Sequence, residues 1–113
     1  MSTLEFTPSS EGEVQIVELT GRLDNLTAQE FDRKMAALPG TRIVLDLAKL
    51  EYISSAGLRS VLGALKRAGA QGGKLALAAP IPSVVEVFEI SGFITLVTVY
   101  PDRASAVAAL HSP

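Results

Sequence analysis

Residues 43–73 read IVLDLAKLEYISSAGLRSVLGALKRAGAQGG, a run that predicts a buried strand followed by an amphipathic helix. The segment 43–47 is typical of an interior parallel strand, because it is apolar except for Asp46. The helix is indicated by apolar residues at the i, i+3, i+4 and i+7 spacing of one buried face, namely Leu58, Val61, Leu62 and Leu65. The glycine pair 72–73 predicts its end. Two serines between strand and helix therefore offer hydroxyl groups where free N–H groups and the positive end of the helix dipole favour an anion.

The sequence before this run predicts a hairpin. Two short strands are expected at 4–6 and 13–19, with Ser-Ser-Glu-Gly at 9–12 as the turn between them. They are expected to be antiparallel, because the connection is too short for a parallel crossover.

A helix is expected between this hairpin and the run that begins at residue 43. Thr27 and Glu30 have the spacing of a capping box, and Leu26 and Phe31 have the spacing of a hydrophobic staple. Pro39-Gly40 predicts the end of the helix.

The sequence after the run alternates strand and helix. Strands are expected at 74–78 and 94–99, and the helix between them begins at Ser83 in a second capping box. Asp102 is placed to cap a final, alanine-rich helix. The order β-β-α-β-α-β-α-β-α predicts one α/β domain. Its central sheet is expected to be mixed and mostly parallel, with an N-terminal antiparallel pair and about four flanking helices.

The composition excludes several classes of function. The 113 residues contain no cysteine, which excludes disulfides, thiol catalysis and thiolate metal sites. His111 is the only histidine, so a catalytic triad or a histidine-rich metal site is not expected. The net charge is -2 with scattered basic residues, which indicates neither a nucleic-acid footprint nor a patch for acidic lipids.

Membrane insertion and catalysis are not expected either. No apolar run reaches the roughly 20 residues of a membrane helix, and the N-terminal residues lack the basic and apolar regions of a signal peptide. We therefore expect a soluble, cytoplasmic protein. The sequence has no glycine-rich phosphate loop, no histidine base and no cluster of metal ligands, so we expect no enzymatic activity, no cofactor and no metal site.

The paired serines Ser54 and Ser55 allow two interpretations. Serine is a common N-cap residue, because its side-chain oxygen accepts a hydrogen bond from a free N–H group of the first turn. A functional role is indicated by Ala56-Gly57, which is small enough for the active site of another protein to approach the backbone. The pair also follows a strand, and loops in that position often carry function in open α/β sheets.

Four motifs together resemble the STAS domain, named for sulfate transporters and anti-sigma factor antagonists. The segment 51–58, EYISSAGL, preceded by IVLDL, resembles the family signature. Three other motifs agree in order and spacing: LTGRLD at 19–24, GG at 72–73 and FEISGF at 88–93. The resemblance covers nearly the whole chain, and residues 1–113 are expected to be a single STAS domain. Its length is similar to that of the stand-alone bacterial anti-sigma factor antagonists.

The resemblance implies a partner switch. The unmodified antagonist binds an anti-sigma factor, which is also a serine kinase, and thereby frees the sigma factor. Phosphorylation of one serine ends the binding, and a metal-dependent serine phosphatase restores it. The family motif is aspartate, the modified serine, serine or threonine, and glycine. Ser54 takes the place of the aspartate, Ser55 that of the modified serine and Ala56 the next position, so Ser55 is the candidate phosphorylation site and Ser54 the second choice.

Other polar residues have both a structural and a functional interpretation. Asp24 could be a turn residue, but by resemblance its loop lies beside the serines and contributes to the partner surface. Asp46 is expected to make a structural hydrogen bond to the loop that follows it. Arg59 and Ser60 could belong to a solvated face or contact the partner. The expected partner surface is therefore Asp24, Ser54, Ser55, Ala56, Gly57, Arg59 and Ser60.

A second function class stays open. The chain could instead be a non-catalytic STAS subunit of a transporter complex or of a signalling scaffold, with no phosphorylation cycle. The absence of the family aspartate at Ser54, and of a hydroxyl at Ala56, favours this alternative.

Overall fold

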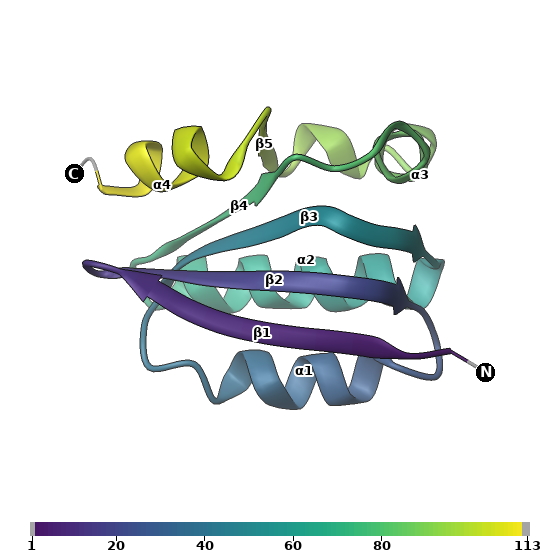
Figure 1. The fold of residues 1–113 in the computed structure, drawn as a ribbon, viewed down its shortest axis with the longest axis horizontal. Coiled ribbons are helices and arrows are strands. Elements are labelled where there is room, and N and C mark those ends of the chain that lie inside the picture. The colour runs from purple at the N-terminus through teal and green to yellow at the C-terminus, as the bar shows by residue number, and fades with distance from the viewer. Residues whose placement is uncertain (1, 112–113) are drawn as a thin grey trace.

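The computed structural model describes residues 2–111 as a five-stranded sheet with helices on both faces (Figure 1). The elements, in chain order, are β1 (Leu4–Glu11), β2 (Val14–Leu23), α1 (Ala28–Ala36), β3 (Arg42–Ile53), α2 (Ser55–Ala70), β4 (Lys74–Ala78), α3 (Pro82–Ile90), the 3-10 turn η1 (Phe93–Thr95), β5 (Thr98–Tyr100) and α4 (Arg103–His111). The predicted order of strands and helices is confirmed, with η1 as an addition. No helix within residues 2–111 is both long and apolar enough to cross a bilayer.

The strands lie side by side in the order of the sequence, from β1 to β5. The first pair is antiparallel and the other three pairs are parallel, as predicted. The hairpin turn is shorter than predicted, because Pro8, Ser9 and Ser10 continue β1 and pair with β2. Only Gly12 and Glu13 remain for the turn, and Gly12 has a φ of +61°, which glycine adopts without strain. Pro8 is tolerated because β1 is an edge strand.

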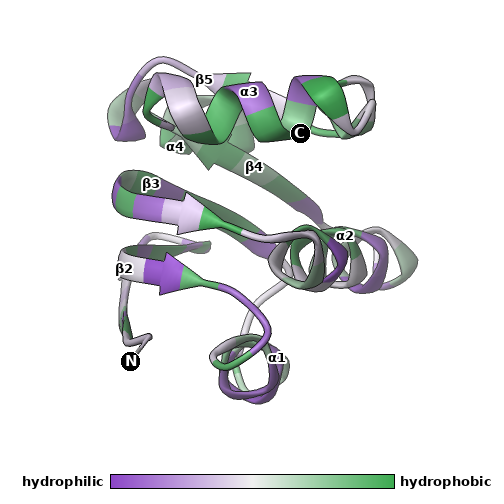
Figure 2. Ribbon diagram, turned by 90° about the vertical axis from the view of Figure 1, so that its right-hand side faces the viewer, coloured by the Kyte–Doolittle hydropathy of each residue, from purple (hydrophilic) through white to green (hydrophobic). Residues whose placement is uncertain are grey.

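The two faces of the sheet have separate cores. The larger core joins the sheet to α1, α2 and α3, and its largest side chains, Phe31 and Phe88, are fully buried. The smaller core lies under α4, where Ala106, Val107 and Leu110 pack on β2, β3 and β4. Figure 2 shows β4 in the hydrophobic colour along most of its length, as expected of a strand with apolar contacts on both faces.

β3 extends well beyond its predicted end near Leu47. Its first five residues pair with both neighbours, and the stretch after Asp46 continues to pair with β2 alone, as far as Leu23 opposite Ile53. Two register shifts interrupt this second part, so the pairing is irregular. The apolar pattern at 43–47 therefore predicted only the part of β3 that is buried on both faces. In the rest of β3 only Leu50 and Ile53 are buried, each after two exposed residues.

Three local predictions are wrong. Thr27 precedes α1 but makes no capping bond, because its hydroxyl donates to Arg22 O at 2.8 Å and accepts from Asp24 N at 3.0 Å. α3 begins at Pro82 rather than Ser83, which agrees with the preference of proline for the first position of a helix. The last strand begins only at Thr98, since residues 93–95 form η1.

Candidate functional site

The two serines have different environments at the junction of β3 and α2. Ser54 is the N-cap of α2, is half-buried, and accepts a hydrogen bond from Gly57 N through its Oγ at 3.2 Å. Its own N–H donates to Leu23 O at 3.0 Å, which ties the junction to the end of β2. The capping interpretation is therefore confirmed for Ser54.

Ser55 is the first residue of α2 and is exposed. Within residues 2–111 its hydroxyl makes no hydrogen bond. The hydroxyl is thus both accessible and chemically free, whereas that of Ser54 is engaged. The first turn of α2 contains no acidic residue that would repel an added phosphate.

Gly57 has a structural reason to be glycine. A Cβ at this position would lie 2.9 Å from Ile53 Cγ1, 3.0 Å from Leu23 Cγ and still closer to the carbonyl oxygen of Leu23. The first turn of α2 therefore packs directly against the end of β2, and Gly57 is buried. The chain itself fills the space that a side chain at position 57 would take, and an approach of another protein to the Ala56-Gly57 backbone stays a prediction.

Asp24 organises the loop between β2 and α1. Its carboxylate accepts hydrogen bonds from Ser2 Oγ and, at 2.9 Å, from Leu26 N, and Arg22 Nε lies 3.7 Å away. The hydrogen bond from Ser2 is the main reason that the pKa of Asp24 is lower than usual. The residue is 5% exposed and its carboxylate bonds within the loop, so the turn interpretation is confirmed, and a direct contact with a partner stays a prediction.

Two large exposed side chains lie next to this loop and were not part of the predicted surface. Leu26 is 68% exposed and does not form the predicted staple, because its backbone is held in the Asp24 turn while Phe31 is fully buried. Tyr52 is 41% exposed and carries the guanidinium of Arg22 over its ring, 4.2 Å from the centroid. Arg22 and Tyr52 are opposite each other in the pairing of β2 with β3, which explains this contact. The sequence alone does not predict it, because it depends on the register of the two strands.

A shallow groove of about 480 Å³ lies between α1 and α2, beside the serines. Its lining includes Asn25, Gln29 and Asp32 from one side and Ala56, Arg59 and Ser60 from the other. The structure brings the predicted surface residues to one end of the molecule but exposes them unequally. Ser55 and Arg59 are exposed, Ser54 and Ala56 are half-buried, and Asp24, Gly57 and Ser60 are buried.

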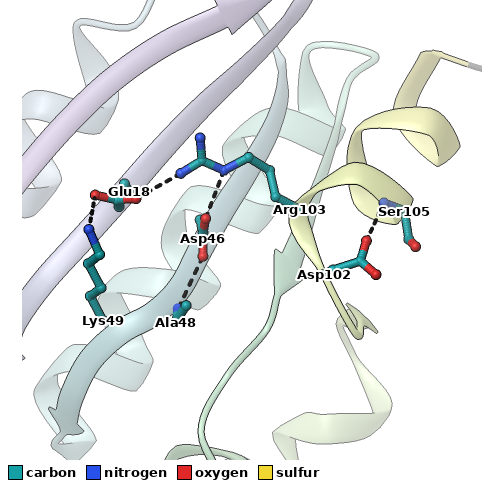
Figure 3. Close-up of polar contacts among 7 residues, drawn as sticks. All are labelled: Glu18, Asp46, Ala48, Lys49, Asp102, Arg103 and Ser105. Carbon is teal, nitrogen blue, oxygen red and sulfur yellow. Dashed lines mark hydrogen bonds and ion pairs between the residues drawn. The ribbon is translucent and has the colours of Figure 1, made fainter.

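The charged residues of the α4 face form a separate cluster (Figure 3). Arg103 from α4 donates to Asp46 Oδ2 and to Glu18 Oε2, each at 2.8 Å, and Lys49 donates to the other oxygen of Glu18 at 3.3 Å. Ala48 N donates to Asp46 Oδ1 at 3.1 Å, so Asp46 makes a structural hydrogen bond as predicted, but its donor lies within β3 and not in a loop. Arg103 was not predicted as a partner. Within residues 2–111 the His, Asp and Glu side chains form no group of three that could hold a metal ion.

Asp102 caps α4 as predicted. Its Oδ1 accepts a hydrogen bond from Ser105 N at 2.7 Å, as Figure 3 shows. This bond lowers the pKa of Asp102. The cap is exposed and lies at the start of the helix whose first residue is Arg103, so it helps to fix the position of that side chain.

Comparisons with known proteins agree on one family. Residues 6–98 match the family model described as "Mlab, STAS domain". The chain is 43% identical to BtrV of Bordetella bronchiseptica, a candidate anti-sigma factor antagonist, over 97 residues that cover 83% of this chain and 84% of BtrV. It is 30% identical to the anti-sigma F factor antagonist of Paenibacillus polymyxa over 102 residues, which cover 87% of each chain.

The fold is shared with solved structures of the same kind. The anti-sigma factor antagonist SpoIIAA in its unphosphorylated form superimposes with a TM-score of 0.81 at 23% identity, over 96% of this chain and 98% of that chain. SpoIIAA of Bacillus in the phosphorylated form gives a TM-score of 0.73 at 23% identity, over 93% of this chain and 98% of that chain. At this level of identity the likeness concerns the fold.

Proposed function

This chain belongs to the STAS domain family, and on that premise we propose that it is an anti-sigma factor antagonist that is switched off by phosphorylation of Ser55. The unmodified chain would bind an anti-sigma factor that is also a serine kinase, and so release a sigma factor. A serine phosphatase of the metal-dependent type would reverse the modification. The proposal is supported above all by one observation: the hydroxyl of Ser55, at the start of α2, is exposed and bonds to no group of residues 2–111.

Ser55 is a better acceptor than Ser54 for a structural reason. A kinase that modified Ser54 would have to remove its oxygen from the bond with Gly57 N. Loss of such a cap costs about 1 kcal/mol, and Ser54 is also half-buried. Neither cost applies to Ser55.

The effect of the phosphate follows from its charge. Phosphorylation adds roughly -1.5 to -2 charges at neutral pH. In the free protein this charge faces water at the positive end of the α2 dipole, so the fold is expected to tolerate it. In a packed interface the same group loses its water, which costs several kcal/mol unless cations pair with it and weakens binding by orders of magnitude.

The alternative is a STAS subunit of a transporter complex or a signalling scaffold. It is favoured by Ser54 and Ala56, which replace the aspartate and the second hydroxyl of the family motif. Such a subunit would use the same surface without being modified.

Phosphate mapping separates the two functions. The purified protein is incubated with ATP and with each candidate serine kinase from its own genome, and phosphate is located by mass spectrometry. Ser83 is the matched control, because it is an exposed serine in the first turn of another helix, α3. Phosphate at Ser55, lost in Ser55→Ala and absent from Ser83, supports the switch. No modification by any kinase, or equal modification of Ser83, contradicts it, and co-purification of a transporter ATPase would then support the subunit.

A further inference from the structure

We propose that Arg59 pairs with the phosphate of phosphorylated Ser55 within the same helix. The inference rests on the proposed function, because it concerns the modified form of Ser55, and it adds the residue that holds the new charge. Arg59 would then have two roles. It faces the partner in the unmodified protein and binds the phosphate in the modified one.

The geometry of α2 places the two side chains on one face. α2 runs without interruption from Ser55 to Ala70, so Ser55 and Arg59 are an i, i+4 pair. Such residues have Cβ atoms about 5–6 Å apart, and the favourable order has the anion on the N-terminal side. Both residues are exposed, so neither has to leave a packed position to meet the other.

Arg59 is available for this contact. Within residues 2–111 its guanidinium forms no ion pair at 4.0 Å or less. The groove that Arg59 lines contains one acid, Asp32 of α1, and a second cation, Arg67, further along α2. The first turn of α2 contributes no acid. A phosphate on Ser55 would therefore be the strongest anion within reach of Arg59.

The chemistry favours arginine for this task. A guanidinium presents N–H donors in a planar fork that matches two phosphate oxygens, and such charge-assisted bonds are stronger than neutral ones. The pair would lower the charge that the phosphate presents to solvent. It would also withdraw Arg59 from the surface that meets the partner, so that one modification changes two charges at the interface.

The test uses the full chain with phosphoserine installed at position 55 during translation, so no kinase is needed. Phosphorus NMR measures the pH at which the phosphate takes up its second proton, in the otherwise unchanged chain and in Arg59→Gln, Arg59→Lys and Arg67→Gln. The expected midpoint in the unchanged chain lies roughly 0.3 pH units below that of Arg59→Gln, because a nearby cation favours the dianion. Arg67→Gln should behave like the unchanged chain, since Arg67 lies 12 residues beyond Ser55 in α2, about 18 Å along the helix axis.

Each outcome decides the point. The pair would be supported by two results: a phosphate midpoint of Arg59→Lys between those of the unchanged chain and Arg59→Gln, and a difference between the latter two that becomes smaller in high salt. Equal midpoints in the unchanged chain and Arg59→Gln would overturn it, as would an equal effect of Arg67→Gln. Circular dichroism checks that all variants are folded. Failure of the proposed function is a separate result, because kinases that ignore Ser55 leave the titration unaffected.

Discussion

Replacing Gly57 by alanine should destabilise the protein, although alanine favours helices. The added methyl group would lie 2.9 Å from Ile53 Cγ1 and 3.0 Å from Leu23 Cγ, well inside the usual 3.5–4.0 Å between carbon atoms. It would be closer still to the Leu23 carbonyl oxygen, which cannot move freely because it accepts the hydrogen bond from Ser54 N.

The magnitude follows from two opposing terms. Inserting a methyl group into a packed site costs about 1–3 kcal/mol, and more where backbone has to move. Alanine gains up to about 1 kcal/mol over glycine in a helix. Because the clash involves backbone, the upper part of the first range applies, and Gly57→Ala is expected to lose about 2 kcal/mol of unfolding free energy.

Gly63 on the same helix provides the control. A Cβ there would have Arg67 Nη1 at 3.7 Å as its nearest neighbour, which is ordinary contact. Gly63→Ala should therefore gain about 0.5–1 kcal/mol. Urea denaturation followed by circular dichroism measures both variants against the unchanged chain. If Gly57→Ala were as stable as Gly63→Ala, the close packing of α2 on β2 would be refuted.

Four further predictions concern single side chains. Arg103→Ala should cost about 1–3 kcal/mol in urea denaturation, because it leaves a buried carboxylate of β3 without its cation, and an unchanged midpoint would contradict this. Because the pKa of Asp24 is lower in the folded state, its ionised carboxylate stabilises the fold at pH values above the ordinary pKa of 3.8, and this contribution is lost as the pH falls through the folded pKa. In Ser2→Ala, NMR titration should show a higher pKa of Asp24. An unchanged pKa would rule out Ser2 as the cause of the shift. Ser54→Ala should lose about 1 kcal/mol of stability and Ser55→Ala less than about 0.5, so equal losses in calorimetry would contradict the division between cap and free hydroxyl. Ser55→Asp should weaken binding to the anti-sigma factor at least tenfold, about 1.4 kcal/mol, while Ser55→Ala binds normally, and equal affinities in calorimetric titration would count against an electrostatic switch.

Local sequence patterns predicted most of the architecture. The apolar periodicity of residues 43–73 was enough to place β3, the serines and α2 in the right order, since both periods depend only on neighbouring residues. The cap at Ser54 is equally local and was found as one of two interpretations. At Thr27 the predicted cap failed because nearby backbone groups compete for the hydroxyl, which bonds to Arg22 O and Asp24 N instead of capping α1.

The site depends on contacts that no local pattern contains. Gly57 looked like an open approach to the backbone, and only the position of Leu23, on another strand, shows that the space for a side chain there is filled. The exposed state of Leu26 follows from the Asp24 turn, which requires Ser2 and Thr27 to be in place. Arg103 bonds to Asp46, which lies 57 residues earlier in the chain. This ion pair can be predicted only when it is known which face of the sheet α4 covers.

The hydrogen bond between Ser2 and Asp24 has a practical consequence for any assay that uses a tag. Ser2 lies beside the loop that follows β2, so a fusion partner attached ahead of it would emerge next to the serines. The other end of the chain is held at Leu110, whose carbonyl accepts from Arg42 at the start of β3. β3 has 12 residues, so its two ends are about 35 Å apart. A reporter linked after α4 therefore leaves the Ser55 surface unobstructed, and binding measured with the two arrangements would differ even though the fold is the same.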